Sequence, residues 1–354
     1  MSQFWSPGID QLSPYIPGEQ PKISGLIKLN TNESPDPPSP KVLEAIRAAA
    51  SDELRLYSDP TSSELVQALA DYHHVDCSQV FVGNGSDEVL AHAFYAFFRQ
   101  TKPLLTPDIS YSFYPVYAGL YQIQIRVIPL NHEFAIDPAD YVGDSGGVVI
   151  ANPNAPTGCL LPLQAVEQIA EQNRHCVVLV DEAYIDFGGE SALGLLDRFD
   201  NVLVVRTFSK SRALAGLRVG YALGSPALID GLVRVKDSFN SYPLDRLAQA
   251  GAVASLADDV YFTECCQKTV ANREKLAADL GSLGFTCLPS AANFLFAKHS
   301  AVSAVDIALN LRKKNVLVRH FSSGRTSEFL RISIGSEEQC ELLLKALADA
   351  LSSC

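Results

Sequence analysis

A lysine that follows an apolar run is the first candidate for chemistry in this sequence. Lys210 comes shortly after "NVLVV", stands between Ser209 and Ser211, and precedes Arg218. Most lysines are solvated surface charges. A lysine that is partly desolvated beside other cations favours its neutral amine, however, and a neutral amine can form a Schiff base with a carbonyl compound. The placement of Lys210 therefore predicts a nucleophile.

Two acidic residues stand at the end of another apolar run, "CVVLV". Asp181 and Glu182 follow it directly. The same pattern holds magnesium in P-loop NTPases, and an aspartate in this place can also simply cap the next helix. The chain contains no Gly-Lys dipeptide, so the GxxxxGK[ST] phosphate loop of those NTPases is absent. Because Lys210 ends the next predicted strand, we favour a site that both residues share.

Two turns follow further apolar runs. "FVGNGSDEVL" predicts a strand, a turn with Gly83 and Gly85, and a helix that begins near Ser86. Backbone N–H groups at a helix start can bind an anion, and glycine lets a phosphate approach closely. An ordinary capped turn is the alternative. "IANPNAPTGCL", residues 150–160, is by itself a turn behind another strand.

Arg331 lies within "FLRISIG", a run that is otherwise apolar or small. It could be a surface arginine at a sheet edge, but a guanidinium that projects from a strand also suits a carboxylate or a phosphate.

The stretch "YHHVDC", residues 72–77, holds two histidines, an aspartate and a cysteine. Adjacent histidines in an extended loop point apart and no second cluster completes the coordination, so we predict no metal.

The elements that must position these residues form an α/β fold. From about residue 40 to 240, apolar runs alternate with helical patterns, which predicts a mostly parallel central sheet between helices. The proline-rich residues 1–40 predict an N-terminal arm, and 41–245 the large domain. Residues 246–354 predict a small C-terminal α+β domain with three short strands. The predicted strands of the large domain are "QVFVG", "PLLTP", "IQIRVIPL", "GVVIANP", "CVVLVDEAY", "NVLVVRTFS" and "LRVGYALG".

Composition narrows the classes of partner and compartment. The chain has 354 residues and a formal net charge of −12, with an isoelectric point near 5.0. Nucleic acids and anionic membranes both require a basic face, so we expect neither as a partner. Eight cysteines are scattered without a CxxC pair, which indicates reduced thiols. With no signal-peptide pattern and no apolar run that could span a bilayer, we expect a cytoplasmic protein.

The order of the strand-end sites resembles that of a known group of enzymes. A phosphate turn, a proline turn, an aspartate and a lysine follow one another as in the fold type I pyridoxal-phosphate aminotransferases. Nearly the whole chain is similar to the histidinol-phosphate aminotransferase family within them. The segments that carry the resemblance are "SPYIPGEQP", "KLNTNE", "LRLYSDP", "NGSDEVL", "NPNAPTG", "VDEAYIDF", "TFSKSRALAGLRVGY", "SFNSYPLDR" and "FLRISIG".

The resemblance implies a function and a role for each catalytic residue. The enzyme would exchange the amino group between L-histidinol phosphate and 2-oxoglutarate in histidine biosynthesis, by a ping-pong route. Lys210 would hold pyridoxal 5'-phosphate as a Schiff base and move a proton, Asp181 would pair with the pyridinium nitrogen, and Tyr184 would bond the phenolic oxygen. The implied cofactor-binding residues are Ser86, Asp87, Tyr111, Asn154, Asp181, Tyr184, Ser209, Lys210, Arg218 and, from a partner subunit, Tyr57.

The resemblance also implies a substrate site and an assembly. Tyr15, Arg319 and Arg331 would surround the anionic end of the substrate, and Asn32 would line the same pocket. A homodimer would share its active sites, because Tyr57 would reach the cofactor phosphate of the other subunit. An aromatic amino acid aminotransferase, a threonine-phosphate decarboxylase and an inactive pyridoxal-phosphate-binding relative are the alternatives.

The sequence departs from the family pattern in two places. Many members have asparagine directly before "PTG", bonded to the phenolic oxygen of the cofactor. This chain has Ala155 there, with Asn154 one residue and Asn152 three residues earlier. The stretch "SPDPP" also replaces the usual continuation of "NTNE", which bears on the shape of the substrate lid.

Overall fold

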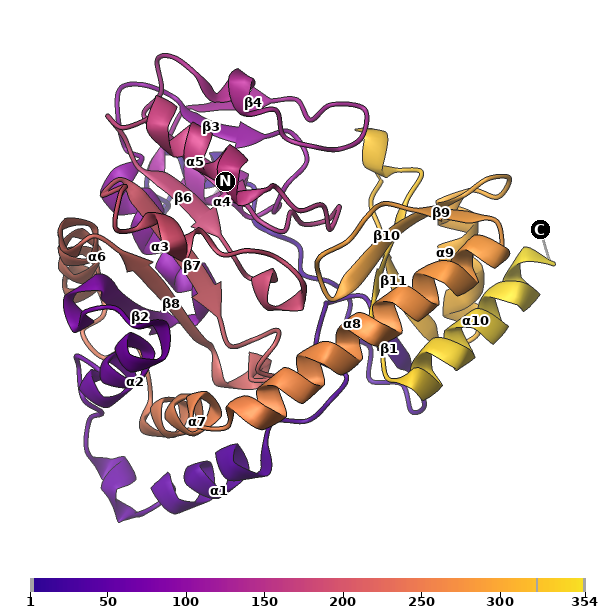
Figure 1. The fold of residues 1–354 in the computed structure, drawn as a ribbon, viewed down its shortest axis with the longest axis horizontal. Coiled ribbons are helices and arrows are strands. Elements are labelled where there is room, and N and C mark those ends of the chain that lie inside the picture. The colour runs from indigo at the N-terminus through magenta and orange to yellow at the C-terminus, as the bar shows by residue number, and fades with distance from the viewer. Residues whose placement is uncertain (1–2, 323, 353–354) are drawn as a thin grey trace.

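The computed structural model describes residues 3–322 and 324–352. Figure 1 shows two bodies side by side, each built on its own sheet, with the long helix α8 (Asp259–Ser282) extending from one to the other. The larger body carries a seven-stranded sheet and the smaller one a five-stranded sheet. Within the described chain, no helix is both long enough and apolar enough to cross a membrane.

The seven-stranded sheet has the order β2-β8-β7-β6-β5-β3-β4. Only β8 runs against its neighbours, so the prediction of a mostly parallel sheet is confirmed. Each strand coincides with one of the seven apolar runs of the sequence, and β2 extends one residue beyond its run. Their bounds are β2 (Val80–Asn84), β3 (Leu104–Pro107), β4 (Ile125–Ile128), β5 (Gly147–Ala151), β6 (Val178–Asp181), β7 (Val202–Thr207) and β8 (Val219–Gly224).

Helices cover both faces of this sheet, which explains why its strands are apolar on both sides. In β6, Val178 and Val180 belong to one core cluster and Leu179 to the other. The first cluster includes residues of α2 (Ser63–His73), α5 (Leu163–Gln172) and α7 (Arg246–Leu256), on which α1 (Pro40–Ala49) packs. The second includes residues of α3 (Gly85–Phe97), α4 (Tyr114–Tyr121) and α6 (Pro226–Phe239).

The five-stranded sheet has the order β1-β11-β12-β10-β9. Three of its strands were expected, namely β10 (Phe294–His299), β11 (Val316–His320) and β12 (Leu330–Ser333). The other two are β1 (Ile27–Leu29) and β9 (Phe285–Cys287). Helices α9 (Ala304–Lys313) and α10 (Glu337–Leu351) complete this body. Because β1 pairs with β11, part of the predicted arm is built into the smaller sheet. The division into three segments stays a prediction.

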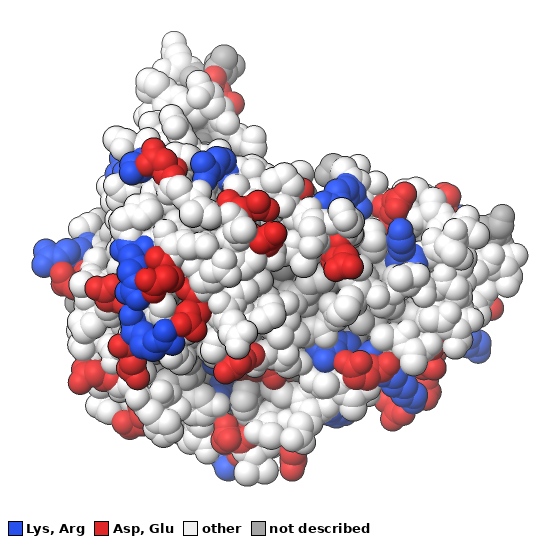
Figure 2. All heavy atoms as spheres, turned by 45° about the horizontal axis from the view of Figure 1, so that its top comes forward, with Lys and Arg blue, Asp and Glu red and all other residues white. Residues whose placement is uncertain are grey.

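The register of the large sheet decides where the chemistry gathers. Asp181 is the last residue of β6 and lies opposite Ala151 of β5 and Val205 of β7. Residues that follow these parallel strands therefore emerge at one edge, where α/β sheets bind their ligands. On the outside, Figure 2 shows acidic and basic side chains interspersed over the face that it presents, without an extended basic patch.

Candidate active site

A small inner cavity of about 100 Å³ lies at the carboxyl edge of the large sheet. Its walls come from the start of α3, the end of β6 and the loop after β7. Most of the residues predicted to hold a cofactor meet here, although they lie far apart in the sequence. They are Ser86, Asp87, Tyr111, Asp181, Tyr184, Ser209, Lys210 and Arg218.

Asp181 is a buried carboxylate at the floor of this cavity. Tyr114 Oη donates a hydrogen bond of 2.9 Å to its Oδ2, and the backbone N–H of Ala183 donates one of 3.2 Å to Oδ1. Burial outweighs these two donors and raises the pKa of Asp181 to about 6. Among the described residues, no lysine or arginine forms an ion pair with Asp181. The carboxylate therefore suits a cationic ligand group.

Another part of the lining of the inner cavity is suited to an anion. The first N–H groups of a helix have no intrahelical acceptor, and those of Ser86 and Asp87 open α3. Arg218 Nη1 lies 3.4 Å from Ser209 Oγ, and its Nη2 forms an ion pair of 2.9 Å with Asp87. A Cβ at Gly85, where φ is +80°, would stand 2.5 Å from Arg218 Nη2. Glycine is therefore required for the arginine to reach the helix start.

Lys210 has few protein partners. Its Nζ lies 3.4 Å from the carbonyl oxygen of Thr31 and 5.7 Å from the centroid of the Tyr184 ring. It lines the inner cavity as well as a larger outer one. An amine with one long hydrogen bond at the junction of two cavities is accessible for chemistry, as a nucleophile must be.

The outer cavity has a volume of about 910 Å³ and joins the inner cavity at Tyr111, Ala155, Tyr184 and Lys210. It lies between the two bodies. All four residues predicted to bind substrate line it: Tyr15, Asn32, Arg319 and Arg331. Tyr15 comes from the arm and packs its ring against Phe113 at 4.8 Å, so the arm forms one wall.

Two guanidinium groups face this outer cavity from neighbouring strands. Arg319 of β11 and Arg331 of β12 are paired in register. Arg331 Nη2 donates to the carbonyl oxygen of Asn30 at 2.8 Å, whereas its Nε is buried without a partner. Desolvation, and to a lesser degree the charge of Arg319, lowers the pKa of Arg331. Within the described ranges neither guanidinium forms an ion pair with an acidic residue, so both positive charges are available to an anionic ligand.

Two predicted residues lie elsewhere. Asn154 is buried, and its amide is used within its own loop: it donates to Ile109 O and Thr157 Oγ1 and accepts from Ser110 Oγ. It lines neither cavity, and we leave it out of the proposed cofactor contacts. Tyr57 is 81% exposed and stacks on Tyr242 at 4.6 Å, so within one chain it does not reach the site.

The structure also brings in residues that the sequence did not indicate. Tyr114 bonds Asp181, and the backbone oxygen atoms of Asn30 and Thr31 accept from Arg331 and Lys210. Tyr114 is one of three tyrosines in "YSFYPVY", and nothing in that pattern shows which of them faces the carboxylate.

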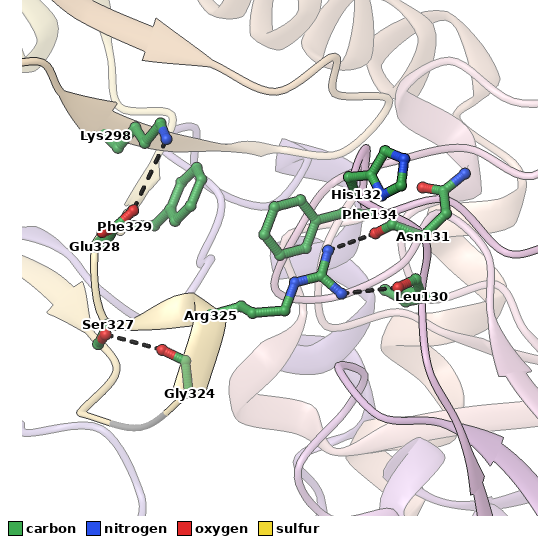
Figure 3. Close-up of a pocket in the computed structure, with 10 residues that line it drawn as sticks. All are labelled: Leu130, Asn131, His132, Phe134, Lys298, Gly324, Arg325, Ser327, Glu328 and Phe329. Atoms are coloured by element: carbon green, nitrogen blue, oxygen red, sulfur yellow. Dashed lines mark hydrogen bonds and ion pairs between the residues drawn. The ribbon is translucent and has the colours of Figure 1, made fainter.

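Arg325 is another residue that the sequence did not indicate. It lines the outer cavity and also a neighbouring open pocket, shown in Figure 3. Its guanidinium crosses between the two bodies and donates to the carbonyl oxygen atoms of Leu130, at 2.7 Å, and Asn131. It also lies 4.4 Å from the centroid of the Phe134 ring. Arg325 therefore fastens the smaller body to the larger one beside the outer cavity.

Comparison with known proteins gives a consistent result. The model of the family "Aminotransferase class I and II" matches residues 24–347. The chain is 60% identical over 353 residues to histidinol-phosphate aminotransferase 1 of Hydrogenovibrio crunogenus, covering 100% of this chain and 99% of that one. It is 57% identical to the histidinol-phosphate aminotransferase of Pseudomonas entomophila, over 98% of this chain and 100% of that one.

The fold is similar to that of a solved structure from the same family. It is the histidinol-phosphate aminotransferase of Sinorhizobium meliloti in complex with pyridoxal-5'-phosphate, which is 26% identical and superposes with a TM-score of 0.90. The match covers 100% of this chain and 99% of that one.

Proposed function

The chain belongs to the class I and II aminotransferases, and we propose that its two cavities exchange the amino group between L-histidinol phosphate and 2-oxoglutarate. The products are imidazole acetol phosphate and glutamate, and the reaction belongs to histidine biosynthesis. The enzyme is a transferase that depends on pyridoxal phosphate. The observation that carries the substrate assignment is the pair Arg319 and Arg331, which face the outer cavity and form no ion pair with a described acidic residue.

The lining of the inner cavity suits two groups of pyridoxal phosphate, the ring nitrogen and the phosphate. A pyridinium cation is the partner that the buried Asp181 carboxylate lacks. The phosphate matches the start of α3 together with Ser209 and Arg218. A Cβ at Gly220 would stand 2.2 Å from the backbone nitrogen of Ser86, so glycine is needed for β8 to pack against this helix start. Tyr111 and Tyr184 would contact the ring and its phenolic oxygen.

Each residue then has a defined task. Bound pyridoxal phosphate withdraws electrons from the substrate's Cα, which weakens the C–H bond there. Asp181 keeps a proton on the ring nitrogen, because an ion pair in a buried site favours the charged form of its partner. The Lys210 amine takes the proton from the substrate's Cα and returns a proton during product formation. Tyr184, at the junction of the cavities, donates to the phenolic oxygen.

The outer cavity would bind the anionic end of each substrate in turn. The fork of Arg331 can donate two hydrogen bonds to a phosphate or a carboxylate. Its unpartnered Nε leaves one donor for that purpose. Arg319 adds a second positive charge, and the Tyr15 hydroxyl a further donor. A single anion site would thus serve both histidinol phosphate and glutamate, as a ping-pong exchange requires.

We further propose that the enzyme is a homodimer. The Tyr57 ring is exposed beside Tyr242, and the arm exposes the large apolar side chains of Trp5 and Ile16. Apolar surface of this kind favours burial against another protein surface. In the dimer, Tyr57 would reach the cofactor phosphate of the partner subunit.

A comparison of amino donors tests the substrate assignment. We expect kcat/KM with L-histidinol phosphate to exceed that with tyrosine, phenylalanine or unphosphorylated histidinol by at least about tenfold, because a buried donor left unpaired costs about 1–3 kcal/mol. Equal or better values for an aromatic amino acid would make the protein an aromatic amino acid aminotransferase. Stoichiometric release of carbon dioxide from threonine phosphate would make it a decarboxylase.

A further inference from the structure

Asn32 is a buried residue that connects three parts of the chain. It follows β1 and adopts the left-handed conformation, with φ of +55°, which asparagine tolerates better than most residues. Its backbone carbonyl accepts a hydrogen bond of 3.1 Å from Asn293 Nδ2. Its side-chain amide reaches Ser333 at the end of β12 and Tyr184 beyond β6. The position is thus fixed from both bodies of the protein.

The hydrogen bonds around Asn32 have a defined direction. Its backbone N–H, which can only donate, lies 2.9 Å from Ser333 Oγ. Ser333 therefore accepts there and has its single hydroxyl hydrogen left to donate, which it does to Asn32 Oδ1 at 2.9 Å. Since Oδ1 faces Ser333, the amide nitrogen faces Tyr184 and donates to its hydroxyl oxygen at 3.0 Å. The fixed backbone donor thus sets the orientation of the amide.

Tyr184 is thereby left with one hydrogen and a restricted choice of acceptor. Its hydroxyl oxygen already accepts from Asn32, so its own O–H points away from the amide. Tyr184 lines both cavities at their junction. Its neighbour Ala155, which packs in the same small apolar cluster, has no side-chain amide to offer. On the side of the inner cavity formed by Tyr184 and Ala155, the Tyr184 hydroxyl is therefore the side-chain group that can donate a hydrogen bond to a bound ligand.

We propose that Asn32, held by Ser333, is a positioning residue that fixes the Tyr184 hydroxyl as a hydrogen-bond donor to the phenolic oxygen of pyridoxal phosphate. This inference rests on the proposed place of Tyr184 beside that oxygen. Asn32 would act on the cofactor through Tyr184, in addition to lining the outer cavity. A purely structural role, in which Asn32 only ties the arm to β12, predicts no effect on the cofactor's electronic state.

The visible absorbance of the bound cofactor, titrated with pH in the absence of substrate, separates the two roles. The Lys210 nitrogen that is bound to the cofactor shares a proton with the phenolic oxygen. A hydrogen bond donated to this oxygen stabilises its negative charge, so the nitrogen loses the shared proton at a lower pH. Loss of the donor should therefore raise the midpoint of the titration. Asn32→Asp has the same shape but presents an acceptor to Tyr184, which would turn the tyrosine hydrogen away from the cofactor. We expect the midpoint to rise by about one pH unit, as for the loss of one hydrogen bond to a charged group.

A double-mutant cycle makes the test specific. Tyr184→Phe should raise the midpoint to a similar extent, and the uncharged variant Asn32→Gly should add almost nothing in that background, because both changes remove the same hydrogen bond. Asn293→Ala is the matched control: it removes a bond to the Asn32 backbone without changing the direction of the others. It should lower the melting temperature and leave the midpoint unchanged. Asn32→Gly is used in the cycle because it tolerates the positive φ and adds no negative charge, whereas the carboxylate of Asn32→Asp favours the protonated cofactor by charge alone.

Each outcome has one meaning. If Asn32→Asp leaves the midpoint unchanged while Tyr184→Phe raises it, the positioning role of Asn32 is wrong. An equal rise from Asn32→Gly in the presence and absence of the tyrosine hydroxyl would also overturn it, because Asn32 would then act directly. If Tyr184→Phe itself has no effect, the proposed place of Tyr184 fails and the inference fails with it. None of these measurements uses substrate, so they do not depend on the choice of amino donor.

Discussion

The hydroxyl of Tyr114 lies 2.9 Å from Oδ2 of Asp181 and donates the only side-chain hydrogen bond that this carboxylate receives from the described residues. Both residues are buried in the larger body. One such donor does not replace the water that an ionised carboxylate loses on burial, and the pKa of Asp181 is accordingly raised to about 6. Without a cation beside it, Asp181 therefore takes up a proton more readily than an exposed aspartate does.

A dependence of stability on pH follows for the cofactor-free protein. Because folding raises the pKa of Asp181 from 3.8 to about 6, its contribution to stability is full below pH 3.8 and is lost as the pH rises through about 6. Asp181→Asn should remove this dependence and raise the melting temperature of the cofactor-free protein at pH 8 by a few degrees. With cofactor bound, the Asp181→Asn protein should instead melt below the wild type. Its turnover should be mostly lost, because an amide cannot pair with the pyridinium by charge.

The control for this prediction is Asp230→Asn. Asp230 is an exposed carboxylate of α6 that pairs with Arg234 at 2.7 Å, so its replacement should leave the pH dependence of melting unchanged. Thermal melts between pH 4 and pH 8, with and without pyridoxal phosphate, provide the measurement. A cofactor-free Asp181→Asn protein that melts below the wild type at pH 8 would mean that Asp181 acts mainly through its hydrogen bonds with Tyr114 and Ala183.

Lys210 should be the lysine that binds pyridoxal phosphate covalently. The purified protein should be yellow, and borohydride reduction followed by peptide mapping should find the pyridoxyl group on Lys210. Lys236 is a useful comparison because it is buried too, but it bonds Pro60 O at 3.0 Å and pairs with Asp237 at 2.8 Å. Lys236→Arg should keep the label on Lys210, whereas Lys210→Arg should abolish it. A label on any other lysine would contradict the assignment.

Much of the fold could be predicted from the sequence because its strands are continuous apolar runs. A run such as residues 176–180 stands out without knowledge of its neighbours, and the order of the runs predicted a mostly parallel sheet. β1 and β9 have three residues each, too few to show a period. β1 is also defined by its pairing with β11, far along the chain. Contacts of that kind leave no local pattern.

The candidate site divides in the same way. Asp181 ends one strand and Lys210 follows another, so both could be located from strand order, since the carboxyl ends of parallel strands meet at one edge. The contacts of Tyr114 and Asn32 depend on how helices and the arm pack, which no spacing in the sequence reveals. The nearness of Asn154 to "PTG" predicts a cofactor contact, but the amide of Asn154 is hydrogen-bonded to Ile109, Ser110 and Thr157 instead. These local hydrogen bonds orient the Asn154 side chain within its own loop, and no pattern in the sequence reveals them.

Complementation between subunits tests the shared active site. Tyr57→Phe and Lys210→Ala subunits should each be nearly inactive alone, whereas a mixed dimer combines one intact Tyr57 with one intact Lys210 in a single site. Random exchange should then restore about a quarter of the wild-type sites, because half of the dimers are mixed and each of these has one complete site. Activity after denaturation and refolding of the mixture is the measurement. Mixtures that exchange subunits, as shown by differently tagged chains, and yet recover nothing would show that Tyr57 serves its own chain or none.

The last prediction concerns the two arginines at the anionic end of the outer cavity. Arg331→Ala should lower kcat/KM for histidinol phosphate and for glutamate alike, by at least about tenfold, because losing a charged hydrogen bond costs about 1.5–3 kcal/mol. The same change should affect unphosphorylated histidinol much less, since that substrate has no anion to place there. The kcat/KM values of Arg331→Lys should lie between those of the wild type and Arg331→Ala, because lysine keeps the charge but loses the planar fork. Arg234→Ala, which removes an exposed arginine of α6, is the control and should alter none of these values. Steady-state kinetics with the three substrates decides the matter: a loss confined to glutamate, or an equal loss for histidinol and histidinol phosphate, would mean that phosphate and carboxylate do not share the Arg331 site.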